Sequence, residues 1–368
     1  MTHEALVLYG DMLSGFGAGT TPFLDALYEG RSAFRPITRF PVGPDRQPLA
    51  ACFPDGLISC APGETLAFCT MKRLADALPP LPPETRLFFA FTTGDAELLE
   101  NAENRWTAEL LAERTAPFFN CRDVRIYSGA CASSGIALAR AAQRVAEGKD
   151  PCILVVACDL VSEFTYSGFS AVGAMTPSFC RPYDRDHNGL LLGDAAAVIL
   201  IGSRETARKT GLRPLAAISG AGFTSDAYHV TAPAPSGECM ARAVRTAMGN
   251  LTPEEIGGVI GHGTGTVLND DMEIRVLQKI FPGGLPLASV KGALGHILAA
   301  SGAVQILAAA EALKRGKLFP QTSLTTPAPG AERFVSSAEQ RLRTGRLLSL
   351  NAGMGGLNSV LLLERIAA

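Results

Sequence analysis

Cys131 has the residue type and the setting that nucleophilic acyl chemistry needs. It lies in the segment Tyr-Ser-Gly-Ala-Cys-Ala-Ser-Ser-Gly, between a predicted strand and the first turn of a predicted helix. Unpaired backbone N–H groups and the positive end of the helix dipole lower the pKa of a thiol placed there. The thiolate is the form that attacks. A tight turn in which the cysteine only fills space fits this segment equally well.

Two of the five histidines follow predicted strands inside glycine-rich segments. His262 lies in Gly-His-Gly-Thr-Gly-Thr after the predicted strand 256–260, and His296 ends Lys-Gly-Ala-Leu-Gly-His after the predicted strand 286–290. Loops at the carboxyl ends of strands form the ligand site in open α/β sheets, and flanking glycines leave space around an imidazole. A single histidine in a loop is more often structural. Two such segments together with Cys131 favour a catalytic group.

The other cysteines and histidines do not indicate a metal site. The sequence has no HExxH or CxxC cluster, and two histidines with one cysteine lack the usual ligand spacing. Nine cysteines without CxxC spacing are typical of reduced thiols in the cytoplasm. We interpret six cysteines as small apolar fillers and three histidines as terminal or loop residues: Cys52, Cys60, Cys69, Cys152, Cys158, Cys239, His3, His187 and His229.

Composition excludes several classes of function. The chain has 368 residues, 47% hydrophobic and 18% charged, which is enough for one large or two medium domains. A net charge of -2 without a Lys/Arg block argues against a nucleic-acid binder. Apolar runs such as Ala195–Ile201 are too short to span a membrane. The first residues lack the pattern of a signal peptide, so we expect a cytoplasmic protein.

The elements that must position these side chains alternate between short apolar strands and helices, which predicts α/β layers. The alternation restarts after Arg213, so we expect two related halves, 1–211 with Cys131 and 212–368 with both histidines. The apolar stripe of the helix 132–147 predicts one buried face. Predicted strands cover 86–92, 125–128, 152–157, 195–201, 215–220, 256–260, 286–290, 347–351 and 359–363, and predicted helices cover 132–147, 237–248, 271–280 and 299–313.

Five segments, in order along the chain, resemble motifs of the elongating β-ketoacyl synthases of the thiolase superfamily. They cover most of the chain, and a fainter match lies at 14–40. Cys180 to Gly189, continuing to Asp194, resembles the Arg-Pro-Phe-Asp stretch, with tyrosine in place of phenylalanine. The resemblance implies a five-layered αβαβα fold of two related halves, in a homodimer or a heterodimer with a similar subunit. The other four segments are the Cys131 turn, 262–273, 291–296 and 351–358.

The resemblance also implies a reaction: decarboxylative Claisen condensation of an acyl group with malonyl-acyl carrier protein, in fatty acid, polyketide or aryl polyene-type synthesis. Both substrates would be thioesters on the carrier's phosphopantetheine, without a further cofactor. Cys131 would carry the acyl group, and His262 and His296 would stabilise the enolate. The remaining implied roles are an orienting ion pair of Lys291 with Glu273, support from Thr264 and Asp270, and an oxyanion hole and gate at Met354 and Gly355.

Departures from the family pattern affect the expected substrate and partner. Met354 stands where the family has a gating phenylalanine, and the stretches near 50–85 and 106–125 are short, which suggests a specialised pathway. A non-catalytic, chain-length-determining subunit of a heterodimer is the main alternative, although such subunits usually lose the nucleophile. A thiolase would need a second cysteine near its end, and none follows Cys239. An initiation-type synthase would carry histidine and asparagine instead of two histidines.

Overall fold

The chain folds around one 11-stranded β-sheet. The computed structural model describes residues 4–42, 48–101 and 107–366. His3 lies outside these ranges, and so does Trp106, the first residue of the shortened stretch near 106–125. The first five strands of the path are β6 (Arg122–Tyr127), β5 (Arg86–Ala90), β7 (Cys152–Asp159), β8 (Ala195–Gly202) and β1 (Leu6–Ser14), with β2 (Gly17–Ala18) paired to β1. The path continues with β9 (Ala216–Ser225), β15 (Leu357–Glu364), β14 (Arg346–Gly353), β10 (Gly258–Ile260) and β11 (Leu287–Ala288).

The sheet consists of two five-strand units with the same pattern. In one unit β6, β5 and β7 are parallel neighbours, and β8 and β1 follow as antiparallel neighbours. In the other, β11, β10 and β14 are parallel, and β15 and β9 follow antiparallel. The loop after β6 therefore corresponds to the loop after β11. The units join where Leu6 and Val7 of β1 pair with Ala217 and Ala216 of β9. The division into domains 1–211 and 212–368 stays a prediction.

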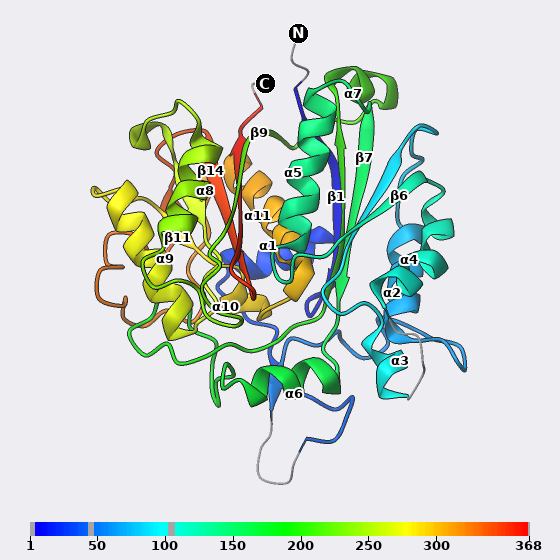
Figure 1. Cartoon of the computed structure of the whole chain (residues 1–368), viewed down its shortest axis with the longest axis horizontal. Helices are drawn as coiled ribbons and strands as arrows, with labels where there is room; N and C mark the ends of the chain where they lie inside the picture. Colours follow the sequence, from blue (N-terminus) through cyan, green and yellow to red (C-terminus); the bar gives the residue numbers. More distant parts are fainter. Residues whose placement is uncertain (1–3, 43–47, 102–106, 367–368) are drawn as a thin grey trace.

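Two small-residue helices lie between the two halves of the sheet (Figure 1). Helix α5 (Ser133–Ala146) packs on β5, β7 and β8 on one side and on β9 and β15 on the other, while α11 (Ser301–Arg315) contacts β14 and α5. The predicted single buried stripe on α5 is therefore too narrow. Ala137, Leu138 and Ala141 are also buried, because both sides of this helix face a sheet and alanine permits the close approach.

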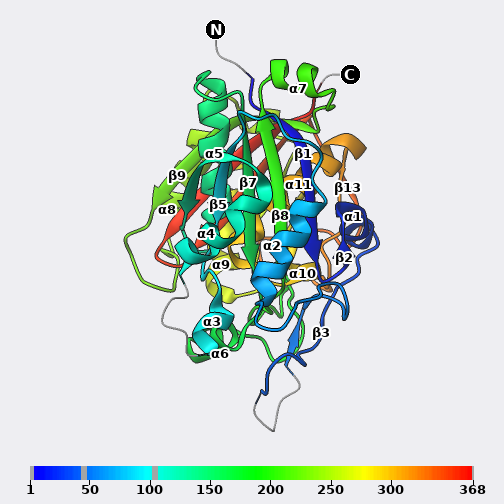
Figure 2. The same ribbon diagram turned by 90° about the vertical axis from the view of Figure 1, so that its right-hand side faces the viewer.

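Outer helices complete five layers. Helices α8 (Glu238–Met248) and α9 (Val267–Ile280) cover the half that contains β9 and β15. Helices α2 (Leu66–Asp76) and α4 (Ala108–Thr115) cover the half that contains β7 and β8 (Figures 1 and 2). Helix α1 (Thr20–Tyr28) packs on β1 and α11. The remaining helices are α3 (Ala96–Glu100), α6 (Glu163–Ala171), α7 (Arg204–Thr210) and α10 (Lys291–Leu294). No helix within 4–42, 48–101 or 107–366 is long and apolar enough to cross a bilayer.

Each predicted strand and helix has a counterpart, with shifted ends. The most consequential shift is in α9, which begins at Val267 instead of residue 271 and so places Asp270 in its first helical turn. An acidic residue there is stabilised by the helix dipole. Sequence patterns did not indicate β1, whose apolar residues are interrupted by Gly10 and Asp11, nor the short outer helices.

Close packing of α8 on β9 predicts sensitivity to a methyl group. A Cβ at Gly222 would lie 2.0 Å from the Ala243 carbonyl oxygen, whereas one at Gly283 would meet nothing within 4 Å. We expect Gly222→Ala to lower the free energy of unfolding by about 1–3 kcal/mol because strand and helix must separate. Chemical denaturation measures this. Gly283→Ala is the control, and equal stability of the two variants would contradict the packing argument.

Candidate active site

The turn before α5 directs Cys131 into the interior. Ala130 has a positive φ of 48°, a conformation that costs a non-glycine residue about 1–2 kcal/mol. Contacts hold it there: the Ser133 hydroxyl donates to the Ala130 carbonyl at 2.6 Å, and the Ala132 amide donates to the Gly129 carbonyl at 3.0 Å. Cys131 is 4% exposed. The turn thus places the thiol at the entrance of the buried helix.

Cys131, His262 and His296 line one pocket of about 290 Å³. The imidazole rings lie edge to face with centroids 5.4 Å apart. The pocket also includes Met354 and Thr264. The structure therefore brings the predicted nucleophile and both predicted imidazoles together, although they are up to 165 residues apart in the sequence.

The backbone fixes which nitrogen of His296 carries its proton. The Leu298 amide donates to Nδ1 at 3.0 Å, so a neutral ring must carry its hydrogen on Nε2. The His296 amide donates to the Leu191 carbonyl at 2.6 Å, and its carbonyl accepts from Gly193 at 3.1 Å. Burial and the Lys291 cation hold the pKa of His296 well below its usual value. This imidazole is a neutral donor.

Two carboxylates hold the turn that carries His262. Glu273 accepts from the amides of His262 and Gly263 at 2.7 and 2.9 Å. Asp270 accepts from the amides of Thr264 and Gly265 at 2.9 and 3.1 Å. The two acids lie three residues apart on α9, on one face of the helix. Four consecutive N–H groups are thereby satisfied without using the imidazole.

Lys291 contacts His262 instead of Glu273. Its Nζ donates to the His262 carbonyl at 2.7 Å and lies 3.3 Å from Nδ1 of the same residue. The expected Lys291–Glu273 ion pair is wrong: both residues are described, and the Glu273 oxygens accept from backbone amides and a tyrosine. Burial lowers the pKa of Lys291 to about 8. Burial, Lys291 and His296 together lower the pKa of His262 well below its usual value.

The expected low pKa of Cys131 is also wrong for the free protein. Burial raises the pKa of this thiol to about 12, with a smaller contribution from Asp159. Lys291 and the backbone amides of Met354 and Cys131 act in the opposite direction. Removal of the sulfur from water outweighs the helix entrance because the thiolate loses its hydration. The resting form is the thiol.

Asp159 is a residue that the sequence patterns did not reveal. Its carboxylate accepts from the amides of Thr92 and Ala299 at 3.0 and 2.8 Å, and so joins the loop after β5 to the segment after His296. Burial raises its pKa to about 6. It directly ends the buried strand β7, so the rule that drew attention to both histidines would have found it.

Of the remaining predicted site residues, most lie at the site. Thr264 lines the pocket with its hydroxyl 2.8 Å from that of Thr266, and Met354 lines it beside the sulfur. Asp270 supports the turn from below. Gly355 is not among the lining residues, and its amide donates to the Val230 carbonyl at 2.7 Å, so it has no N–H left for an oxyanion.

Models of one family match both halves of the chain. The β-ketoacyl synthase N-terminal domain matches residues 98–207, and its C-terminal domain matches residues 215–325, together more than half of the chain. The chain belongs to the β-ketoacyl synthase family. A family relative, 3-oxoacyl-[acyl-carrier-protein] synthase 2 of Staphylococcus aureus (strain COL), is 30% identical over 251 residues. That match covers 65% of this chain and 61% of the relative, less than two thirds of its length.

Solved ketosynthase structures share the fold over the whole chain. The ishigamide ketosynthase/chain length factor is 25% identical, with 100% coverage of both chains and a TM-score of 0.88. A type II PKS ketosynthase solved with its acyl-carrier protein is 19% identical, with 100% coverage of both chains and a TM-score of 0.84. The predicted thiolase-like five-layered fold is confirmed.

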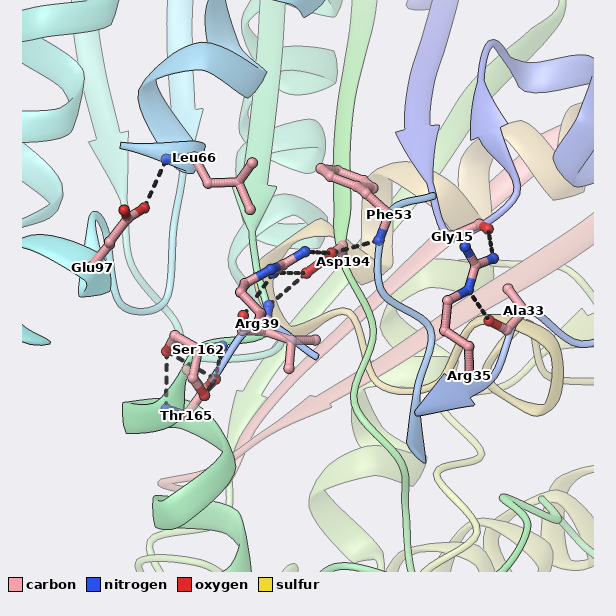
Figure 3. Close-up of polar contacts among 11 residues, drawn as sticks. Gly15, Ala33, Arg35, Arg39, Phe53, Leu66, Glu97, Ser162, Thr165 and Asp194 are labelled. Carbon is pink, nitrogen blue, oxygen red and sulfur yellow. Dashed lines mark hydrogen bonds and ion pairs between the residues drawn. The ribbon is translucent and has the colours of Figure 1, made fainter. Parts of the chain in front are cut away.

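Within this β-ketoacyl synthase fold, a partly exposed arginine pairs with the buried carboxylate of Asp194 (Figure 3). Arg39 Nη2 lies 2.6 Å from Asp194 Oδ2. Asp194 also accepts from the amides of Phe53 and Val161, both at 2.7 Å. The neighbouring Gly193 amide donates to the His296 carbonyl, so this carboxylate anchors the segment against which the imidazole is held.

Outside the site, two of the simpler interpretations were wrong. Cys60 is exposed and Cys239 is partly exposed, so neither is a core filler. His187 and His229 both lie in loops, as predicted; His187 is buried, with its Nε2 3.5 Å from the Asp271 carboxylate, whereas His229 is exposed. In the described part of this family member, no three His, Cys, Asp or Glu side chains group as metal ligands.

The raised pKa of Cys131 predicts slow alkylation in the free protein. A pKa of about 12 leaves about one thiol in 10⁴ ionised at pH 8, so we expect iodoacetamide to modify Cys131 at least about 100-fold more slowly than exposed Cys60. Peptide mass spectrometry measures both rates. At pH 7, where Lys291 is protonated, Lys291→Met should slow Cys131 further. Equal rates at Cys60 and Cys131 would contradict the assignment.

Proposed function

We propose that this chain catalyses the decarboxylative Claisen condensation of an acyl group with malonyl-acyl carrier protein, giving a β-ketoacyl-carrier protein. The observation that carries the proposal is the shared pocket of Cys131, His262 and His296. A thiol can hold an acyl group covalently, and two imidazole N–H groups can stabilise an enolate oxygen. Family membership supports the same reaction class.

The first step transfers the acyl group to Cys131. The sulfur attacks the carrier thioester, the carrier sulfur leaves, and the thiol proton goes to it, so that an enzyme thioester and a free carrier thiol result. The amides of Cys131 and Met354, which lie close to the sulfur, are placed to donate to the oxyanion of the tetrahedral intermediate. One such donor typically contributes about 3 kcal/mol of transition-state stabilisation.

The second step uses both imidazoles. The malonyl thioester carbonyl accepts from Nε2–H of His262 and His296. The bond to the carboxylate breaks, carbon dioxide leaves, and the electron pair of that bond stays on the thioester fragment as the enolate. The enolate carbon attacks the acyl carbonyl, and the Cys131 sulfur leaves and regains a proton. Neutral rings suit this role, and the lowered pKa values of both histidines support it. Lys291 keeps Nδ1 of His262 occupied, which favours a proton on Nε2.

The substrates would arrive on an acyl carrier protein. Val172, Val267 and Leu268 line the pocket and are about half exposed, so they form an apolar rim that a carrier could cover while its phosphopantetheine arm enters. No other cofactor is needed. We expect the reaction to occur in the cytoplasm, where all nine free cysteines would stay reduced.

A second subunit of the same fold would complete the assembly, as a homodimer or a heterodimer. β6 is an edge strand of the sheet, with four of its six residues exposed, and an exposed edge is a template for pairing. A chain-length-determining role in a heterodimer is the second candidate, favoured by the likeness to the ishigamide ketosynthase/chain length factor over the whole chain. The retained Cys131, His262 and His296 favour the catalytic role.

The role of Cys131 predicts a mass change. After incubation with acyl-carrier protein, the intact protein should gain the mass of one acyl group, Cys131→Ala should gain none, and Cys60→Ala, altered at an exposed cysteine, should behave as the unaltered chain. His296→Ala should lower carbon dioxide release from malonyl-carrier by about 10²–10³-fold. Full product formation by Cys131→Ala with a co-purified synthase would instead support the non-catalytic role.

The apolar rim predicts a carrier-specific defect. Leu268→Glu should raise KM for the acyl-carrier protein and leave turnover of a small pantetheine thioester unchanged, because only the macromolecule covers the rim. Leu215→Glu is the matched control, since Leu215 is 43% exposed and absent from the pocket, whereas Leu268 is 59% exposed. Steady-state kinetics with both donors measures the split. Equal effects on both donors would refute the docking role.

A further inference from the structure

Tyr183 lies beneath the turn that carries His262, at the position where the related motif has phenylalanine. We propose that Tyr183 is a positioning residue for His262, acting through the carboxylates of Glu273 and Asp270; its effect on catalysis rests on the proposed function. The residue is fully buried. The contacts of its hydroxyl are therefore made with protein groups and not with solvent.

Tyr183 donates to both acids that hold the His262 turn. Its hydroxyl lies 2.8 Å from Glu273 Oε2, and its backbone amide lies 2.9 Å from Asp270 Oδ2. Glu273 in turn accepts from the amides of His262 and Gly263. One residue from a separate loop thus joins the two carboxylates, and the imidazole is placed through them.

The phenol fits only because the turn is built with glycine. A Cβ at Gly261 would lie 2.0 Å from the Tyr183 hydroxyl, and one at Gly263 would lie 2.5 Å from it. Gly263 also has a positive φ of 28°, which disfavours other residues. The hydroxyl therefore occupies the space immediately under the backbone of His262. A phenylalanine ring would fill most of this space and leave Glu273 with one donor fewer.

Glu273 accepts three hydrogen bonds, and each of its contacts is a hydrogen-bond donor. This arrangement fits the ionised carboxylate, which has no proton to donate. Other charged groups act on it: Asp270 on the same helix opposes its ionisation, and Lys291 attracts it. Burial raises the pKa of Glu273, while the Tyr183 hydroxyl and the two amides lower it. Loss of the hydroxyl should therefore raise that pKa further.

Protonation of Glu273 would loosen the turn. A protonated carboxyl has one acceptor oxygen fewer for the amides of His262 and Gly263, so the imidazole would lose its fixed position. In Tyr183→Phe, Glu273 would become protonated at a higher pH than in the unaltered chain. The hydroxyl contributes to stability above the folded-state pKa of Glu273, and this contribution is lost as the pH falls through that value.

The catalytic test is the pH profile of malonyl-carrier decarboxylation. In Tyr183→Phe we expect the acid limb to move upward by about one pH unit, with kcat for decarboxylation lowered. The KM for the acyl donor, measured in the complete condensation, should be unchanged. Tyr28→Phe is the control, because the Tyr28 hydroxyl donates to the Lys317 carbonyl at 2.8 Å and neither residue lines the pocket. A profile of Tyr183→Phe that superimposes on that of the unaltered chain overturns the proposal.

A second measurement separates this inference from the proposed function. The imidazole ¹⁵N signals of His262 should titrate or broaden at a higher pH in Tyr183→Phe than in the unaltered chain or in Tyr28→Phe. The loss of stability in Tyr183→Phe should shrink as the pH falls, and it should be largely absent in a Glu273→Gln background. If the unaltered chain releases no carbon dioxide, the proposed function fails. The His262 signals still test whether Tyr183 positions His262. Unchanged His262 signals overturn the role of Tyr183.

Discussion

Burial of the reactive side chains around one pocket controls the chemistry of this chain. The same burial keeps Cys131 as a thiol, keeps both imidazoles neutral and weakens the proton affinity of Lys291. The proposed role of the two histidines requires neutral imidazoles. A permanent thiolate at Cys131 would react with any electrophile. The buried carboxylate of Glu273 is tolerated because each of its contacts is a donor.

The repeated strand pattern explains how distant residues reach this pocket. Cys131 follows β6, and His296 follows β11, the strand that occupies the same position in the second unit. Each is followed by one of the two central helices, α5 or α11, which pack against each other. His262 follows β10, whose counterpart β5 leads to Thr92 and the Asp159 contact. Two copies of one architecture thereby supply opposite sides of the site.

Sequence patterns predicted the layers and the three reactive side chains because strand ends and glycine-rich turns are local features. They did not predict contacts that depend on tertiary packing. Lys291 and Glu273 are separated by the His262 turn, which no spacing rule reveals, and the direction of the Cys131 pKa depends on burial by both sheet halves. The sequence showed Tyr183 only as a tyrosine in place of a phenylalanine, because the partner of its hydroxyl, Glu273, is known only once α9 is in place.

The pairing of β1 with β9 makes the halves parts of one sheet, and this has a consequence for folding. β15, encoded at 357–364, lies between β9 and β14 in the middle of the second unit and also contacts α5. A ribosome must therefore synthesise nearly all of the described chain before α5 can acquire its full packing. Such high contact order slows folding, and an incomplete chain would expose the apolar side of its nucleophile helix to chaperones.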